Sequence, residues 1–347
     1  MEITRELFEA QRYPKFGTSN PERMRNDFWE WMIRGDRGPL EGSPGSAGTP
    51  VLAREGKPKS SFGPHHARNL FESHHDRCDG PIWTFDRMGA SCTELPDERT
   101  VFVGGEHEDS YDQDFCIYND VVVFRSREIE IYGYPKEIFQ PTDFHTATAI
   151  GDLIIIIGCI GYPSDRRNGE TPVYLLHLNG YRISALQTSG ENPGWISKHE
   201  AYIGPNGSIT VSGGSTLVEK NGEWRVRRNF DDYEFNPRSL VWRRLTERNW
   251  RQFQIRQLDR AAFEFEHRPE PKSLVPRGID CAVVAGKEWN QCRIEVKGMQ
   301  VSFTVGVACV EIIIEGDLSE EMSMRIAQEV LARAEEITSR KCILELL

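Results

Sequence analysis

The sequence lacks a surplus of positive charge and any long hydrophobic run. Its 42 Lys and Arg residues are outnumbered by 53 Asp and Glu residues, which gives a net charge of −11. A protein that follows nucleic-acid phosphates needs clustered excess cations, so we expect no nucleic-acid partner. The longest apolar run, Leu153 to Gly161, is too short to cross a bilayer, so we expect no membrane partner either.

Cysteine pairs, an export signal and catalytic motifs are also missing. The eight cysteines are scattered and form no Cys-x-x-Cys pair, which predicts free thiols in a reducing compartment. The first 16 residues carry charge throughout and lack the apolar core of a signal peptide, so we expect a cytoplasmic protein. No nucleophile elbow, phosphate loop, dinucleotide fingerprint or zinc-protease helix is present. These absences favour a protein that is not an enzyme and uses no cofactor.

What the sequence does contain is a repeat. Three short β-type runs end in glycine: Val101–Val103 before Gly104-Gly105, Leu153–Ile157 before Gly158, and Ile209–Ser212 before Gly213-Gly214. The first glycines of successive runs are 54 and 55 residues apart. A second marker has the same period, because His145 precedes Gly158 by 13 residues and His199 precedes Gly213 by 14. A β-rich unit of about 50 residues fits four short strands that must stack on neighbouring units, as in one propeller blade.

These residues resemble the Kelch-repeat β-propeller family, which has the galactose-oxidase-like propeller fold, over about residues 83–245. The family pattern is matched by Asn119-Asp120-Val121-Val122, by Pro172-Val173-Tyr174-Leu175, by the linker from Thr188 to Ala201, and by Trp242-Arg243-Arg244-Leu245. Two positions depart from it, since Cys159 replaces a glycine and Ile183 stands where Trp is expected. The resemblance implies a mainly β fold: a Kelch-type propeller with an N-terminal helical segment and a small C-terminal α+β module. Three units are clear, and residues 247–267 are candidates for a degenerate further blade.

The expected domains are 1–80, 81–270 and 271–347. The first comprises helices over residues 1–35, with Asn20-Pro21-Glu22 as a helix start, and a Gly/Pro-rich linker over 35–64. The last comprises β-like runs at 292–296, 301–307 and 310–315, then a helix over Glu320–Thr338 capped by Ser319. Met322, Ile326, Val330 and Ala334 recur every four residues on one face of that helix, and a final strand covers 341–347.

The candidate partner-binding residues lie after glycine-terminated strands. Carboxylates gather directly after the first Gly-Gly, at Glu106, Glu108, Asp109, Asp112 and Asp114 around Tyr111. This predicts an acidic loop on one face of the propeller, and the alternatives are a calcium site, a surface for a basic partner, or a solvated loop.

Basic and aromatic candidates accompany the acidic run. Arg166, Arg167 and the run from Trp224 to Arg228 are basic spots that suit either carboxylate clamps or ordinary surface. Trp195 fits either an exposed contact residue or an aromatic that packs between blades.

The histidines suggest structure more than chemistry. His145 and His199 occur once per repeat, which favours a role in bonding the backbone between blades over acid–base catalysis. His65, His66, His74 and His75 precede Asp76 and Cys78, a composition that suits zinc. Neighbouring histidines of one segment rarely reach one centre, however, so we assign no metal and leave open whether the region 65–78 binds one.

The resulting functional hypothesis is a non-catalytic Kelch-type protein that binds a protein partner, expected to be basic. One concrete form is an immunity protein that neutralises a basic toxin or enzyme. The alternative is a Kelch-type enzyme, either a metal-dependent oxidase or a sugar epimerase, that acts on a small molecule.

Overall fold

The computed structural model of the chain describes residues 3–34, 64–71, 80–109, 112–126, 128–259, 268–284, 286 and 288–347, without the side chains of residues 64, 65, 68, 69, 108, 109 and 112–114. It is mainly β, as expected, and divides into two compact units. The first unit comprises Met1–Trp224 with Asp232–Leu245, and the second comprises Arg225–Asp231 with Thr246–Leu347. No helix in the described ranges is long and apolar enough to cross a membrane.

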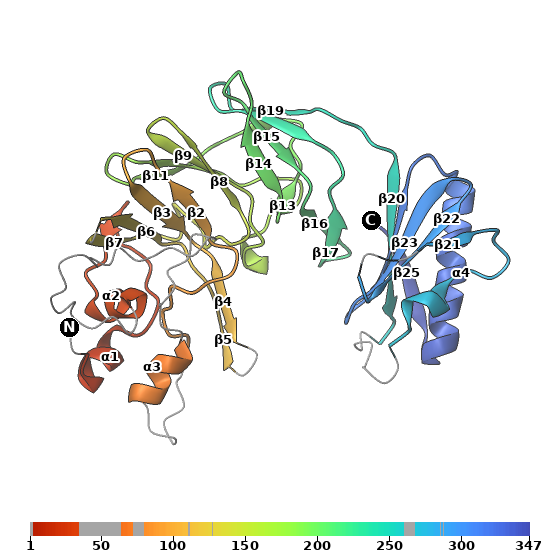
Figure 1. Cartoon of the computed structure of the whole chain (residues 1–347), viewed down its shortest axis with the longest axis horizontal. Helices are drawn as coiled ribbons and strands as arrows, with labels where there is room; N and C mark the ends of the chain where they lie inside the picture. Colours follow the sequence, from red (N-terminus) through yellow and green to blue (C-terminus); the bar gives the residue numbers. More distant parts are fainter. Residues whose placement is uncertain are drawn as a thin grey trace, which may run out of the picture. The chain divides into compact units, whose positions relative to one another are not determined.

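Three antiparallel sheets with the same internal order form the body of the first unit (Figure 1). The first sheet contains β2 (Ser91–Glu94), β3 (Arg99–Val103), β6 (Val121–Arg125) and β7 (Glu128–Gly133), with β1 (Glu22–Arg23) beside β7. The second contains β8 (Thr146–Ile150), β9 (Leu153–Ile157), β10 (Val173–His177) and β11 (Ile183–Ala185). The third contains β14 (Glu200–Ile203), β15 (Ile209–Ser212), β18 (Tyr233–Asn236) and β19 (Val241–Arg244), with β12 (Ser189–Gly190) parallel to β19. The three glycine-terminated runs are therefore the second strands of three separate sheets, which confirms the predicted repeat.

Apolar patterning along these strands follows from what covers each face. Val101 and Val103 pack with Ile154 and Ile156 of the second sheet, in one buried cluster. The alternate residues of the second sheet, Ile155 and Ile157, belong to a cluster shared with the third sheet. A strand covered on both faces is apolar at every position, which explains the run Leu-Ile-Ile-Ile-Ile. In the third sheet, β15 alternates buried and half-buried residues, Ile-Thr-Val-Ser, as expected of a strand with one covered face.

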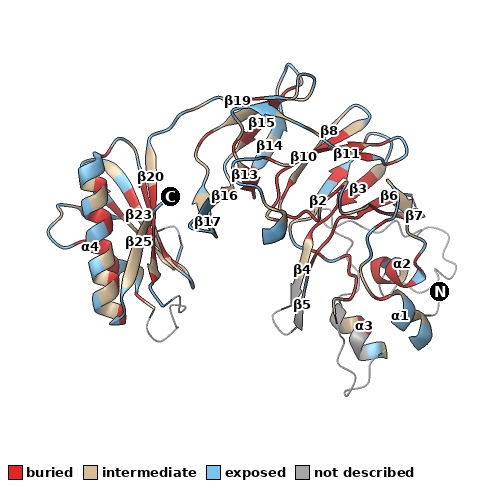
Figure 2. Cartoon of the chain, turned by 180° about the vertical axis from the view of Figure 1, so that it is seen from behind, coloured by how far each residue is buried: buried red, intermediate tan, exposed pale blue. Residues whose placement is uncertain are grey.

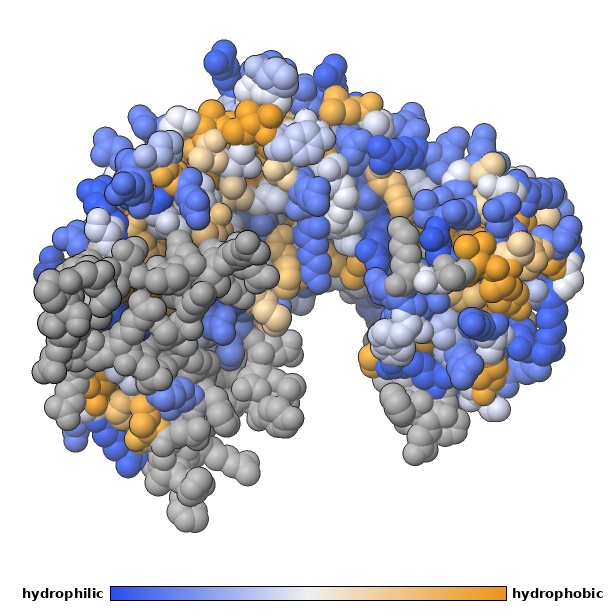
Figure 3. Space-filling model, in the orientation of Figure 1, coloured by the Kyte–Doolittle hydropathy of each residue, from blue (hydrophilic) through white to orange (hydrophobic). Residues whose placement is uncertain are grey.

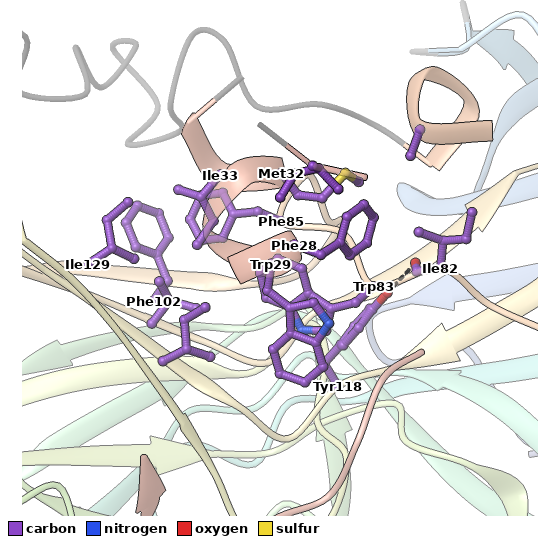
Figure 4. Close-up of a cluster of buried hydrophobic side chains, with 14 of the residues drawn as sticks. Phe28, Trp29, Met32, Ile33, Ile82, Trp83, Phe85, Phe102, Tyr118 and Ile129 are labelled. Atoms are coloured by element: carbon purple, nitrogen blue, oxygen red, sulfur yellow. Dashed lines mark hydrogen bonds between the residues drawn. The ribbon is translucent and has the colours of Figure 1, made fainter. Parts of the chain in front are cut away.

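The other face of the first sheet is covered by the N-terminal helices α1 (Arg5–Gln11), α2 (Asp27–Arg34) and α3 (Pro64–Phe71). In this cluster Trp29 of α2 stacks on Trp83, with ring centroids 4.8 Å apart, beside Phe28 and Met32 (Figure 4). Buried aromatic pairs of this kind add about 0.5–1.5 kcal/mol beyond their area. The helices thus pack as one element with the first sheet.

The helix start predicted at Asn20-Pro21-Glu22 is wrong. Glu22 belongs to β1 and pairs with Gly133, so the segment extends the first sheet and α2 begins at Asp27. Asn26 caps that helix, because its side-chain oxygen accepts from Trp29 N at 2.9 Å. The Asn20 amide instead exchanges hydrogen bonds with the backbone of Ile183, at 2.6 and 2.9 Å.

The second unit is a six-stranded sheet with one long helix packed against it. Its order is β21 (Ala282–Val284), β22 (Gln291–Val296), β23 (Met299–Val305), β24 (Val310–Glu315), β20 (Trp250–Gln257) and β25 (Cys342–Leu346). The helix α4 (Glu320–Thr338) turns Ile326, Val330 and Ala334 inward, and Ser319 caps it, as predicted (Figure 2). A short 3-10 helix, η3 (Pro271–Leu274), completes the buried cluster.

The further blade proposed over residues 247–267 is wrong in its described part. β20 is an inner strand of the second unit, paired with β24 and β25, and it does not belong to the repeated sheets. Its Phe253 and Ile255 are buried in the same cluster as the residues of α4. The second unit therefore takes in residues from Thr246 onward, rather than beginning at 271.

Candidate functional site

The connections between second and third strands leave each repeated sheet from the same end. In the first sheet the connection is a hairpin, β4 (Glu106–Asp109) and β5 (Asp112–Ile117). In the second it is the segment 158–172, which includes the 3-10 turn η1 (Pro163–Asp165). In the third it contains β16 (Ser215–Lys220) and β17 (Glu223–Arg228), which form a sheet with β13 (Trp195–Ser197). Figure 1 shows the β4–β5 hairpin extending away from the first sheet.

Side-chain contacts join these three connections into one surface, which we call the connection face. Ile117 N of the first hairpin donates to Tyr162 Oη at 2.8 Å, and Phe115 packs edge-on against the same ring. The guanidinium of Arg166 lies 5.9 Å from the ring centre of Trp224 at the start of β17. Figure 3 shows hydrophilic side chains interspersed with smaller hydrophobic patches over the described surface.

Glycine at the sheet ends is required by close packing. A Cβ on Gly104 would lie 2.2 Å from Thr142 O, and one on Gly158 would lie 2.2 Å from Ile196 O. Both have positive φ, +55° and +74°, which L side chains rarely adopt. Gly214 repeats the arrangement, with Ser197 O at 2.4 Å and a φ of +75°.

The predicted acidic loop is a β-hairpin. Glu106, Glu108, Asp109 and Asp112 lie on β4 and β5, which pair with a register shift between His107 and Asp109. Asp114 also lies on β5. The segment forms a hairpin instead of a loop because pairing of β4 with β5 satisfies the hydrogen-bonding groups of its backbone. Tyr111 and the side chains of Glu108, Asp109, Asp112 and Asp114 lie outside the described residues.

Glu106 has a partner inside the first unit. Its side chain acts on the carboxyl group of Asp143 and lowers the pKa of that group. Asp143 is fully buried, and its Oδ1 accepts from Ile160 N at 3.1 Å and from Gly161 N at 2.7 Å. Burial raises the pKa of Asp143 despite the lowering by these amide bonds. The two amide bonds to Asp143 fix the turn that follows β9.

Arg166 is not a surface clamp, because its guanidinium faces the chain itself. Its Nε and Nη2 donate to the carbonyl oxygens of Ile160 and Gly161, at 2.9–3.2 Å. Arg167 is different, since its side chain is 67% exposed and lies 3.8 Å from Glu170. Of this predicted basic pair, only Arg167 therefore presents its charge to solvent.

Trp195 is a packing residue and not an exposed contact. It is 2% exposed, and its indole N–H donates to Ile160 O at 3.0 Å. It packs with Cys159 and Leu217 in a small cluster under the connection face. Trp195 and Arg167 also line one polar hollow of about 500 Å³ beside β10 and β11.

The basic run after Trp224 is divided between a buried ion pair and the surface. Arg225 is buried, and its Nε lies 2.8 Å from Glu345 Oε2 within the second unit. Arg228 lies 3.7 Å from Glu311. Arg225 consequently stabilises the sheet that contains β20 and β25, whereas the side chain of Arg228 is 52% exposed and lies at the surface.

The two repeat histidines bridge consecutive sheets through side-chain hydroxyls, not through the backbone as predicted. His145 Nε2 lies 2.8 Å from Ser91 Oγ, and His199 Nε2 lies 2.9 Å from Thr146 Oγ1. Ser91 and Thr146 are the first residues of the edge strands β2 and β8. Burial lowers the pKa of His145 to about 3 and that of His199 to about 4, so both rings are neutral near pH 7.

Sequence reasoning missed one buried charged group. Arg87 binds Asp120 through two hydrogen bonds, at 2.5 and 2.9 Å, and its guanidinium lies 3.4 Å from the ring centre of Tyr118. Trp83 Nε1 donates to the same carboxylate at 2.8 Å. The Asn119-Asp120 motif was visible in the sequence, but its partner Arg87 lies 33 residues earlier and carries no spacing signal.

The histidine-rich segment is described only in part. His66 lies in α3, 6.2 Å from the ring of Trp31. The side chain of His65, and all of His74, His75, Asp76 and Cys78, lie outside the described residues. Within the ranges that the structure describes, no three His, Cys, Asp or Glu residues group as metal ligands would.

Comparison with known proteins identifies no family. No protein-family model and no curated protein match the sequence. Among solved structures, one described as "Structure of YjhT" aligns with 12% sequence identity and a TM-score of 0.31. The alignment covers 64% of this chain and 64% of that one, so the chain spans just under two thirds of its length. A TM-score of this size identifies no common fold.

Proposed function

We propose that this chain is a non-catalytic binding protein whose three repeated sheets are blades of Kelch type and whose connection face receives a basic protein. One observation carries the proposal: equivalent connections leave three successive sheets at the same end and contact each other. Segments joined to a rigid scaffold in this way are the common location of binding residues. A concrete form is an inhibitor of immunity type.

Charge supports a basic partner. The β4–β5 hairpin carries five carboxylates between residues 106 and 114, in a chain of net charge −11. Like charges so close together gain from meeting a cationic surface, and such complementarity accelerates association.

The reactive side chains near this face support a role without chemistry. Both repeat histidines are buried, neutral and bonded to hydroxyl groups. Burial raises the pKa of the Cys116 thiol to about 11 and that of Cys159 further, so neither is a thiolate near pH 7. These groups fit packing roles better than nucleophilic or acid–base roles.

The test compares two variants that each remove three negative charges. The first is Glu108→Ser, Asp109→Ser, Asp112→Ser in the hairpin. The matched control is Glu94→Ser, Glu98→Ser, Glu128→Ser, at the opposite end of the first sheet. Each protein is immobilised and used to capture binding proteins from the cells that make it. Association rates with the captured protein are then measured at about 50 mM and about 500 mM salt.

We expect the hairpin variant to associate about tenfold more slowly at low salt, and the control to match the wild type. The wild-type rate should fall as salt rises, because screening weakens charge steering. The proposal fails if no protein is retained specifically. It also fails if the hairpin variant associates as fast as the wild type and the wild-type rate ignores salt.

A further inference from the structure

A second feature of the first unit, independent of the acidic hairpin side chains, is an aromatic pocket. It has a volume of about 270 Å³ and lies between the base of β5 and the N-terminal segment 13–16. Its lining includes Tyr13, Lys15, Phe16, Trp83, Tyr118 and Asp120. We call it the aromatic pocket.

Its floor is rigid and electrically balanced. Trp83, Tyr118 and Asp120 are all at most 4% exposed. The Asp120 carboxylate is satisfied by two bonds from Arg87 and one from the Trp83 indole. The floor therefore combines buried aromatic residues with a matched ion pair, and it favours an uncharged, apolar group.

Its outer wall is held in place at both ends. Trp83 N donates to Arg12 O at 2.7 Å, directly before Tyr13, and Gly17 N donates to Tyr134 O at 3.0 Å, directly after Phe16. Between these bonds, Phe16 is 51% exposed although it lines the pocket. A fixed backbone that keeps a large apolar ring in water suits a preformed site, since ligand binding then orders little.

Size and charge narrow the ligand class. A cavity of about 150 Å³ holds one benzene, so 270 Å³ has room for a bicyclic ring with a short substituent. The two charged lining residues are Asp120, matched by Arg87, and Lys15, an exposed residue of the outer wall. The ammonium of Lys15 therefore sets the sign of charge at the mouth. We propose that the aromatic pocket binds a small planar aromatic compound that carries a carboxylate.

The test uses three probes with the same ring and different charges: indole-3-acetate, indole and tryptamine. Binding to the full-length protein is measured by calorimetry and by saturation-transfer NMR. We expect a dissociation constant on the order of 1 mM or below for indole-3-acetate, given its number of heavy atoms. The dissociation constant of tryptamine should be at least about threefold higher than that of indole-3-acetate, and that of indole should lie between them.

Variants of exposed residues test the position of the site without threatening the fold. Phe16→Ala should weaken all three probes about fivefold or more. Tyr202→Ala, an equally exposed aromatic on β14 in the third sheet, should change nothing. Lys15→Glu should make tryptamine bind more tightly than indole-3-acetate and leave the affinity for indole unchanged. The proposal is overturned if no probe binds saturably, if Phe16→Ala binds like the wild type, or if Lys15→Glu leaves the order intact. None of these outcomes bears on the hairpin measurement, so the two proposals fail separately.

Discussion

Mild acid should destabilise the first unit through its two repeat histidines. Burial lowers the pKa of His145 to about 3 and that of His199 to about 4, from an ordinary value of 6.5. The unfolded chain takes up protons at both rings near pH 6.5, whereas the folded chain leaves them neutral. The stability that the two neutral histidines contribute is therefore fully present above pH 6.5, and it is lost as the pH falls toward their pKa values in the folded chain.

The size of the effect follows from these pKa values. Between about pH 7.5 and about pH 5.5, protonation of one unfolded-state histidine costs the folded state about 1.4 kcal/mol. Two such histidines give a loss of about 3 kcal/mol, a large part of the stability of an ordinary domain. Burial raises the pKa of Asp143, so that carboxyl acts in the opposite sense at lower pH. The measurement accordingly stays above about pH 5.5.

Urea unfolding followed by tryptophan fluorescence at several pH values measures this loss, since six of the eight tryptophans lie in the first unit. His145→Gln and His199→Gln keep a hydrogen-bonding group near each hydroxyl but cannot be protonated. Each should remove about half of the pH dependence, and the double variant most of it. The reasoning is refuted if the double variant loses stability between pH 7.5 and 5.5 as steeply as the wild type.

Three further changes probe stability. Gly214→Val should lower the free energy of unfolding by about 3 kcal/mol or more, because the new Cβ lies 2.4 Å from a carbonyl oxygen. Gly213→Val places its Cβ in open space at a positive φ, so it should cost about half as much. Equal urea midpoints for the two variants would contradict the packing argument. Arg87→Met leaves the buried Asp120 carboxylate without its cation and should cost about 3–5 kcal/mol, whereas a loss under about 1 kcal/mol in urea unfolding would show that the carboxylate finds other solvation. Ile326→Ala should cost about 2–5 kcal/mol in the second unit, and hydrogen exchange should show the loss there and not in the repeated sheets.

The repeated sheets could be predicted because each repeat must satisfy the same packing conditions. Gly104, Gly158 and Gly214 stand where a neighbouring carbonyl leaves no room for a Cβ, and that restriction recurs after 54 and 56 residues. The run of isoleucines in β9 is apolar throughout because both faces of its sheet are covered. The helix α4 could also be predicted, since burial of one face places its apolar residues about four positions apart.

The candidate site was predictable only in its location. The acidic run does follow the first glycine pair, but nothing local showed that it forms a hairpin, because strand pairing depends on both partner segments. Trp195 and Arg166 have the residue types of contact residues, yet each bonds the carbonyl oxygen of Ile160. Residue type alone does not indicate which way a side chain points.

By itself, the sequence determined the β-rich repeat, the helix α4 and its buried face, and the acidity of the first connection, because each depends on local pattern or composition. Only the tertiary structure decided that β20 joins the second unit, since its apolar residues suit any covered sheet and the available partners are distant in sequence. The same holds for the pairing of Arg87 with Asp120 and for the aromatic pocket beside it. Both are made by segments that meet only when the chain is folded, and long-range contacts of that kind leave no periodic signal.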